Sequence, residues 1–122
     1  MKKRVLIVED ELPSRMLLEH VLSKNYQVTC LANGKEAIQW LNAGNVTDLL
    51  LTDLEMPYMS GVELINQLET VPMHNAIPVI ILSSCDAKEL TSLTKTDAVQ
   101  AMMSKPFNLT SLQVHISNSL AS

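Results

Sequence analysis

Four short pieces of this sequence place reactive side chains directly after runs of apolar residues. The reactive residues are Glu9 with Asp10, Asp53, Ser83, and Lys105 with Pro106. If the apolar runs are parallel strands, all four pieces lie at one edge of one sheet, where open α/β sheets bind their ligands. The expected site then contains three carboxylates, a hydroxyl and an ammonium group.

This set of side chains favours phosphoryl-transfer chemistry. Each close pair of carboxylates repels by about 4 kcal/mol at 4 Å in a medium of dielectric near 20, so a divalent cation such as Mg²⁺ (or Mn²⁺) is expected among Glu9, Asp10 and Asp53. Lys105 adds a fixed positive charge, and Ser83 adds a hydroxyl. Phosphoryl transfer depends mainly on such positioning and charge neutralisation. Asp53 is the best candidate nucleophile, because its strand is central and a phosphoryl group there reaches the metal, Ser83 and Lys105 together.

Strand-like and helix-like segments alternate along the whole chain. The predicted segments are Arg4-Val8, Pro13-Ser23, Tyr26-Leu31, Gly34-Asn42, Asp48-Thr52, Gly61-Glu69, Ile77-Ser83, Lys88-Leu93, Ala98-Met102 and Asn108-Leu120. Five successive βα units predict an α/β fold with a doubly wound parallel sheet. A chain of 122 residues is long enough to form a single domain over 1–122.

Composition narrows the class of protein. Apolar residues make up 47% of the chain and aromatic residues only 3%, so Leu, Ile, Val and Met must fill the core, as in sheets buried on both faces. A net charge of −4 argues against direct nucleic-acid binding. No apolar run reaches the length of a signal or membrane segment. Cys30 and Cys85 are too far apart to suggest a disulfide framework. We expect a cytoplasmic protein without a membrane segment.

Three motifs carry a family resemblance that spans almost the whole chain. The segment Val-Glu-Asp-Glu at 8–11 resembles the acidic pair of a known signalling family. The segment Asp-Leu-Glu-Met-Pro-Tyr-Met-Ser-Gly at 53–61 resembles the phosphoacceptor motif of the same family. Ser83 stands where Thr or Ser is usual, and Lys105-Pro106-Phe107 completes the pattern. Together they resemble the receiver domain of bacterial two-component response regulators.

The resemblance implies a fold and a phosphoacceptor. It implies a flavodoxin-like, five-stranded parallel sheet of order 2-1-3-4-5 flanked by five helices. Asp53 would be phosphorylated by a sensor histidine kinase or a histidine phosphotransfer domain, and by small phosphodonors. The domain would catalyse its own phosphorylation and dephosphorylation rather than act as a conventional enzyme.

The resemblance also implies roles for the other site residues. Asp10, Asp53 and the backbone carbonyl of Glu55 would hold Mg²⁺, with Glu9 acting through water. Ser83 would move to the phosphoryl group, and Lys105 would pair with it. The Lys105-Pro106 peptide bond would be cis, which is far less costly before proline than elsewhere.

Two features depart from the family pattern. Met102 stands where the family commonly has Tyr or Phe, so the usual coupling of the hydroxyl to an aromatic rotamer is absent or altered. The segment 108–122 contains no Asp, Glu, Lys or Arg, which removes ion pairing as a route to a dimer and predicts a monomer. No output domain is visible in this sequence, so a protein partner of unknown identity is expected to read the signal.

Three alternatives remain open. A flavodoxin-like cofactor binder should have a Gly- and hydroxyl-rich loop after the first strand, whereas this loop is Glu-Asp-Glu. A haloacid-dehalogenase-type phosphatase should carry its nucleophile after the first strand rather than the third. A receiver-like interaction module that works without phosphorylation is favoured by Met102 and disfavoured by the intact Asp53, Ser83 and Lys105.

Overall fold

The apolar runs form five parallel strands in one sheet. The computed structural model describes residues 2–83 and 98–121, and the strand order is β2-β1-β3-β4-β5. The strands are β1 (Arg4–Val8), β2 (Gln27–Leu31), β3 (Leu49–Asp53), β4 (Val79–Ser83) and β5 (Val99–Ser104). The predicted doubly wound sheet and its order are therefore confirmed.

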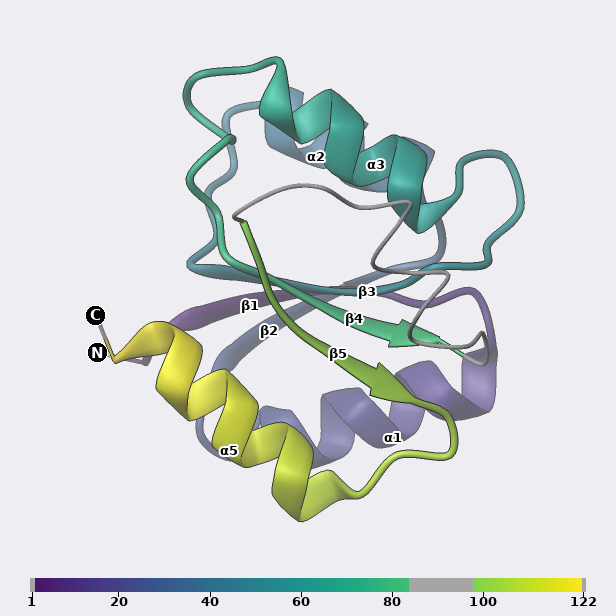
Figure 1. Ribbon diagram of the computed structural model, residues 1–122, viewed down its shortest axis with the longest axis vertical. Helices are drawn as coiled ribbons and strands as arrows, with labels where there is room; N and C mark the ends of the chain where they lie inside the picture. The colour runs from purple at the N-terminus through teal and green to yellow at the C-terminus, as the bar shows by residue number, and fades with distance from the viewer. Residues whose placement is uncertain (1, 84–97, 122) are drawn as a thin grey trace.

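Helices cover both faces of the sheet. The described helices are α1 (Leu12–Leu22), α2 (Gly34–Asn42), α3 (Gly61–Glu69) and α5 (Leu109–Leu120). Helices α2 and α3 lie over one face, and α1 and α5 lie over the other (Figure 1). The bounds of the described elements differ from the predicted ones by no more than two residues. The predicted helix Lys88-Leu93 and Cys85 lie outside the described residues.

Local side-chain chemistry explains where three of these helices begin. Asn33, Ser60 and Asn108 are the N-cap residues of α2, α3 and α5, and each side chain accepts a hydrogen bond from the amide three residues later. Such caps satisfy amides that have no partner inside the helix. Helix α1 begins without a side-chain cap but has Pro13 in its first turn, where the missing amide hydrogen costs no helical hydrogen bond.

Two hydrophobic layers hold the helices to the sheet. Side chains alternate across each strand, so Leu6 and Val8 of β1 join the layer under α2 and α3, while Val5 and Ile7 join the layer under α1 and α5. All five residues of β3 and of β4 are buried. This arrangement makes β3 a central strand and fixes the position of Asp53 at its end.

Two residues at the margin of the core, Cys30 and Trp40, are only partly buried. Cys30 on β2 is half-buried, and burial, followed by its hydrogen bond with Glu19, raises the pKa of its thiol to about 12. Trp40 on α2 packs against the hydrophobic layer under α2 and α3. Within the described parts of the chain, none of the helices has both the length and the apolar character needed to cross a membrane.

Candidate functional site

The sheet register brings the reactive side chains to one edge. Val8 is paired with Thr52 in the β1–β3 register, so Glu9 and Asp53, the next residues, follow side by side. Asp53 pairs with Leu82, and Ser83 pairs with Ser104 at the end of β5. The residue after Ser104 is Lys105, whose amide donates to the Ser83 carbonyl at 2.9 Å. All of these residues therefore lie at the carboxyl edge of the sheet.

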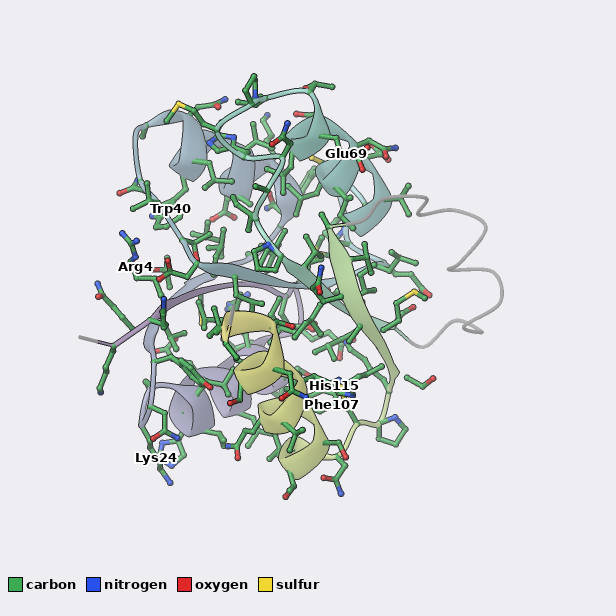
Figure 2. The ribbon with its side chains drawn as sticks, turned by 60° about the vertical axis from the view of Figure 1, so that its left-hand side comes forward. Arg4, Lys24, Trp40, Glu69, Phe107 and His115 are labelled. Atoms are coloured by element: carbon green, nitrogen blue, oxygen red, sulfur yellow. The ribbon has the colours of Figure 1, made fainter. Side chains whose placement is uncertain are left out.

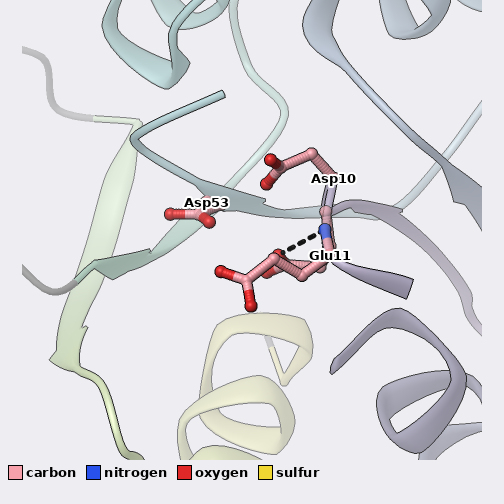
Figure 3. Close-up of side chains that lie close together, drawn as sticks. Asp10, Glu11 and Asp53 are labelled. Carbon is pink, nitrogen blue, oxygen red and sulfur yellow. Dashed lines mark hydrogen bonds between the residues drawn. The ribbon is translucent and has the colours of Figure 1, made fainter. Parts of the chain in front are cut away.

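Four carboxylates converge at this edge. Glu9, Asp10, Glu11 and Asp53 each offer an oxygen, and these oxygens lie within 4.8 Å of one another. Figure 3 shows the carboxylates of Asp10, Glu11 and Asp53 gathered around the same space. We refer to these four residues as the acidic pocket. Asp53 and Glu9 are buried, whereas Glu11 is exposed.

Lys105 is the cation that bridges two members of the acidic pocket. Its ammonium lies 2.9 Å from Asp53 Oδ2 and 3.0 Å from Glu9 Oε2. Burial of Lys105 opposes its charged form, but the hydrogen bonds and charges of Asp53 and Glu9 together outweigh this effect, so the pKa of Lys105 is raised. The lysine thus remains a fixed positive charge.

The remaining oxygens of the pocket have unequal surroundings. Glu9 Oε1 accepts a hydrogen bond from the Glu11 amide at 3.1 Å, drawn as a dashed line in Figure 3. Burial raises the pKa of the Glu9 carboxyl, against the lowering effect of Lys105 and of this amide. Asp53 Oδ1 accepts from the Glu55 amide at 3.3 Å. Asp10 Oδ1 is buried and has no hydrogen-bond partner.

The unpartnered oxygen of Asp10 is evidence that the pocket suits a cation. A buried carboxylate oxygen without a partner is costly, and the four carboxylates share one bridging lysine among the described residues. Hard divalent cations take oxygen ligands of this kind. The donor set therefore fits a divalent metal ion on the side of the pocket where Asp10 lies.

Other predicted residues occupy definite positions. Ser83 is fully buried at the end of β4. The Lys105-Pro106 peptide bond is cis. Met102 is paired with Ile81 and packs against the hydrophobic layer under α2 and α3. The side chain at position 102 is therefore partly buried against the core rather than placed in the acidic pocket.

Sequence reasoning missed three contributors to this site. Glu11 joins the carboxylate cluster, and its position directly after the acidic pair was an available signal. The Arg15 guanidinium donates to the Glu9 carbonyl at 2.9 Å, and no motif marked it. Gly61 closes the loop after β3, because its amide donates to the Leu54 carbonyl at 2.8 Å and a Cβ there would lie 2.5 Å from the Asp53 carbonyl.

Comparisons with known proteins agree with this geometry. The family model described as "Response regulator receiver domain" matches residues 5–117. The sensor histidine kinase TmoS of Ectopseudomonas mendocina is 36% identical over 115 residues, which cover 94% of this chain and 12% of that protein. This chain therefore spans only a small part of the length of that relative.

Two solved structures have similar sequences as well as the same fold. The signal receiver domain of a histidine kinase from Syntrophus aciditrophicus is 32% identical, with a TM-score of 0.86, 98% of this chain covered and 90% of that one. The response regulator TrrA of Thermotoga maritima, solved with Mg²⁺-BeF, is 30% identical, with a TM-score of 0.81 and 97% and 99% covered. The parallel sheet, the acidic pocket and the family match together show that this chain belongs to the response regulator receiver domains of two-component signalling, which accept phosphoryl groups from histidine kinases rather than act as conventional enzymes.

Proposed function

We propose that this receiver domain accepts a phosphoryl group on the carboxylate of Asp53. The donor is the phosphohistidine of a sensor histidine kinase or of a histidine phosphotransfer domain. A carboxylate oxygen of Asp53 forms the new bond to phosphorus as the bond from phosphorus to the histidine nitrogen breaks. The observation that carries the proposal is the Lys105 ammonium, held 2.9 Å from Asp53 Oδ2 in a pocket of four carboxylates.

Lys105 neutralises charge at the oxygen that reacts. A phosphoryl group spreads negative charge over its oxygens during transfer, and the raised pKa of Lys105 keeps the ammonium charged through this step. Its second contact, with Glu9 Oε2 at 3.0 Å, fixes the position of the ammonium. Ser83, at the end of the neighbouring strand, is proposed to donate its hydroxyl to the phosphoryl group.

The proposal includes Mg²⁺ or Mn²⁺ in the acidic pocket. Asp10, Asp53 and the backbone carbonyl of Glu55 would hold the ion, with Glu9 acting through water, and the unpartnered Asp10 Oδ1 supports this assignment. When bound, the ion supplies positive charge to the phosphoryl oxygens. The related TrrA structure was solved with Mg²⁺-BeF.

The proposed setting is a cytoplasmic signalling pathway. The phosphorylated domain would change its surface for a downstream protein partner, without binding nucleic acid or membrane itself, and it would act as a monomer. Met102, which is partly buried against the core, stands in place of the usual aromatic residue, so the change is proposed to pass without the usual coupling of the hydroxyl to an aromatic rotamer.

The test is the mass of the intact protein after incubation with acetyl phosphate and Mg²⁺. We expect one added phosphoryl mass that is absent in Asp53→Asn. Asp48→Asn is the matched control, because Asp48 pairs with Arg4 rather than with Lys105, and it should be labelled like the wild type. If neither acetyl phosphate nor a phosphorylated sensor kinase labels Asp53, the proposal is wrong and a phosphorylation-independent interaction module becomes the better account.

A further inference from the structure

The loop that follows Asp53 carries a tyrosine in an unfavourable backbone conformation. Tyr58 has a φ of 68° and is the one non-glycine residue with positive φ among the described residues. The Met59 amide donates to the Pro57 carbonyl at 2.8 Å, which makes Tyr58 the centre of a three-residue γ-turn, a rare and strained geometry. The chain uses glycine at its other described left-handed position, Gly44, where no Cβ is strained.

Packing within this domain does not explain the tyrosine. Its exposed fraction is 84%, so the ring gains little from burial. The neighbours anchor the turn instead. Met59 packs against Gly34 of α2, with side-chain atoms 3.0 to 3.1 Å from the position of a Cβ there, and Met56 packs against the core. The fold therefore needs the turn but not the ring that the turn presents.

The loop that carries Tyr58 lies beside Asp53, where a protein phosphodonor must approach. The Gly61 amide returns to the Leu54 carbonyl at 2.8 Å, so the loop that carries Tyr58 starts and closes beside Asp53. Asp53 itself is only 5% exposed. Any protein that delivers a phosphoryl group to so buried a carboxylate must approach over the loops that surround it.

Helix α1, which begins directly after Glu11 of the acidic pocket, also exposes apolar side chains. Leu12 and Met16, which follow Glu11 on α1, have exposed fractions of 55% and 62%. Lys105 and the cation proposed for the pocket offset its negative charge, so a partner's phosphohistidine can enter while the surface of the partner covers the apolar border. Tyrosine is enriched among the residues that dominate binding energy at protein interfaces, because its ring buries a large area with few rotatable bonds.

We propose that Tyr58 is an anchor residue through which the protein phosphodonor docks over the acidic pocket. The turn holds the ring outward before binding, so little conformational freedom is lost when the partner covers it. This inference rests on the proposed function. It predicts that Tyr58 affects transfer from a protein donor and not from a small one.

The test compares Tyr58→Gly, Tyr58→Phe and the control Met73→Ala with the wild type. Met73 is 80% exposed and lines a small cavity together with Gly44 and Asn45, beyond the end of α3 rather than on the loop after β3. The protein donor is an autophosphorylated sensor histidine kinase, chosen from a panel as the one that transfers fastest to the wild type. The small donor is acetyl phosphate with Mg²⁺.

We expect Tyr58→Gly to lower kcat/KM for transfer from the kinase by about tenfold or more, mainly through KM, as expected for a dominant interface residue. Labelling by acetyl phosphate should stay within about twofold of the wild type, because Tyr58 is not placed at the reacting atoms. Tyr58→Phe should restore kinase transfer, and Met73→Ala should leave both reactions unchanged. Glycine suits the left-handed turn, so Tyr58→Gly should unfold at the wild-type temperature or above it.

Each contrary result has a distinct meaning. Equal kinase transfer by wild type and Tyr58→Gly overturns the inference alone. A lowered unfolding temperature, or an equal loss of labelling by both donors, makes Tyr58 a structural residue and also overturns it. If no donor labels Asp53 of the wild type, both the proposed function and this inference are wrong.

Discussion

Each edge of the sheet carries one basic side chain paired with an aspartate: Arg4 with Asp48 at the amino edge, and Lys105 with Asp53 at the carboxyl edge. The two pairs differ in burial and in the balance of charge around them. At the amino edge, Asp48 accepts hydrogen bonds from the backbone amide and the guanidinium of Arg4, and both side chains remain partly exposed. Arg4 projects from the end of the molecule where β1 begins (Figure 2). At the carboxyl edge, Lys105 is shared between Asp53 and Glu9 among further carboxylates.

The comparison separates a structural ion pair from a reactive one. The Arg4–Asp48 pair balances one charge with another and satisfies both oxygens of the carboxylate. The acidic pocket has an excess of negative charge and a buried oxygen of Asp10 without a partner. An excess of one charge in a buried place creates a need for a ligand of the opposite charge, whereas a balanced pair near the surface does not.

The largest expected difference between the edges is in reaction rate. Lys105→Gln should slow labelling of Asp53 by acetyl phosphate about 100-fold or more, the usual effect of removing one charged or hydrogen-bonding group from a reacting oxygen. Arg4→Gln should leave the labelling rate unchanged, because its guanidinium pairs with Asp48. Time courses by intact-protein mass measure both rates. Equal slowing in both variants would show that Lys105 acts only through the stability of the fold.

Two glycines provide a second contrast. Gly61→Ala should destabilise the fold by about 1–3 kcal/mol, because its Cβ would meet backbone atoms of Asp53 and Leu54 at 2.5 and 2.9 Å. Gly44→Ala should cost about 1 kcal/mol, because its φ is 100° although no described residue beyond its two chain neighbours comes within 4 Å of the added Cβ. Urea unfolding measures both free energies. In addition, only Gly61→Ala should slow phosphorylation; an unaffected rate would mean that the loop after β3 adapts without moving Asp53.

Metal binding should stabilise the protein through the carboxyl edge alone. At a free Mg²⁺ concentration of about 100 times Kd, linkage predicts about 2.7 kcal/mol of added stability, seen as a rise in Tm. Asp10→Asn should lose most of this rise, since it removes a carboxylate from the pocket. Asp48→Asn should keep it. A Mg²⁺-dependent rise that survives in Asp10→Asn would place the metal elsewhere.

The smallest expected effect is on the stability of the fold, at the Arg4–Asp48 pair of the amino edge, and it depends on pH. The hydrogen bonds from Arg4 lower the pKa of Asp48, so its carboxylate stabilises the fold above its unfolded pKa of about 3.9, and this contribution is lost as the pH falls through the lower folded value. Asp48→Asn should cost about 1 kcal/mol at pH 7, a modest value because the pair is partly exposed. The gap between variant and wild type should narrow below about pH 4. Thermal unfolding across pH tests this; a gap that widens in acid would contradict the assignment.

The sequence pattern was sufficient to predict the parallel sheet and most of the pocket, and the family resemblance supplied the strand order. Apolar runs that alternate with amphipathic segments leave few topologies open, and reactive residues at the ends of successive strands must share one edge. Glu11 and Arg15 were not predicted as parts of the site. Their contributions depend on how the turn from β1 into α1 directs each side chain, and side-chain direction at a loop has no periodic signal in the sequence.

The sequence by itself determined which chemical groups meet at the carboxyl edge, because runs of apolar residues predict where each strand ends and parallel strands end at one edge of the sheet. Only the tertiary structure decided how those groups share their charges. It placed Lys105 between Asp53 and Glu9, left Asp10 Oδ1 without a partner and turned Tyr58 outward in a left-handed turn. These outcomes depend on distances of a few ångströms between residues remote in sequence, and electrostatic and hydrogen-bond energies change steeply over such distances.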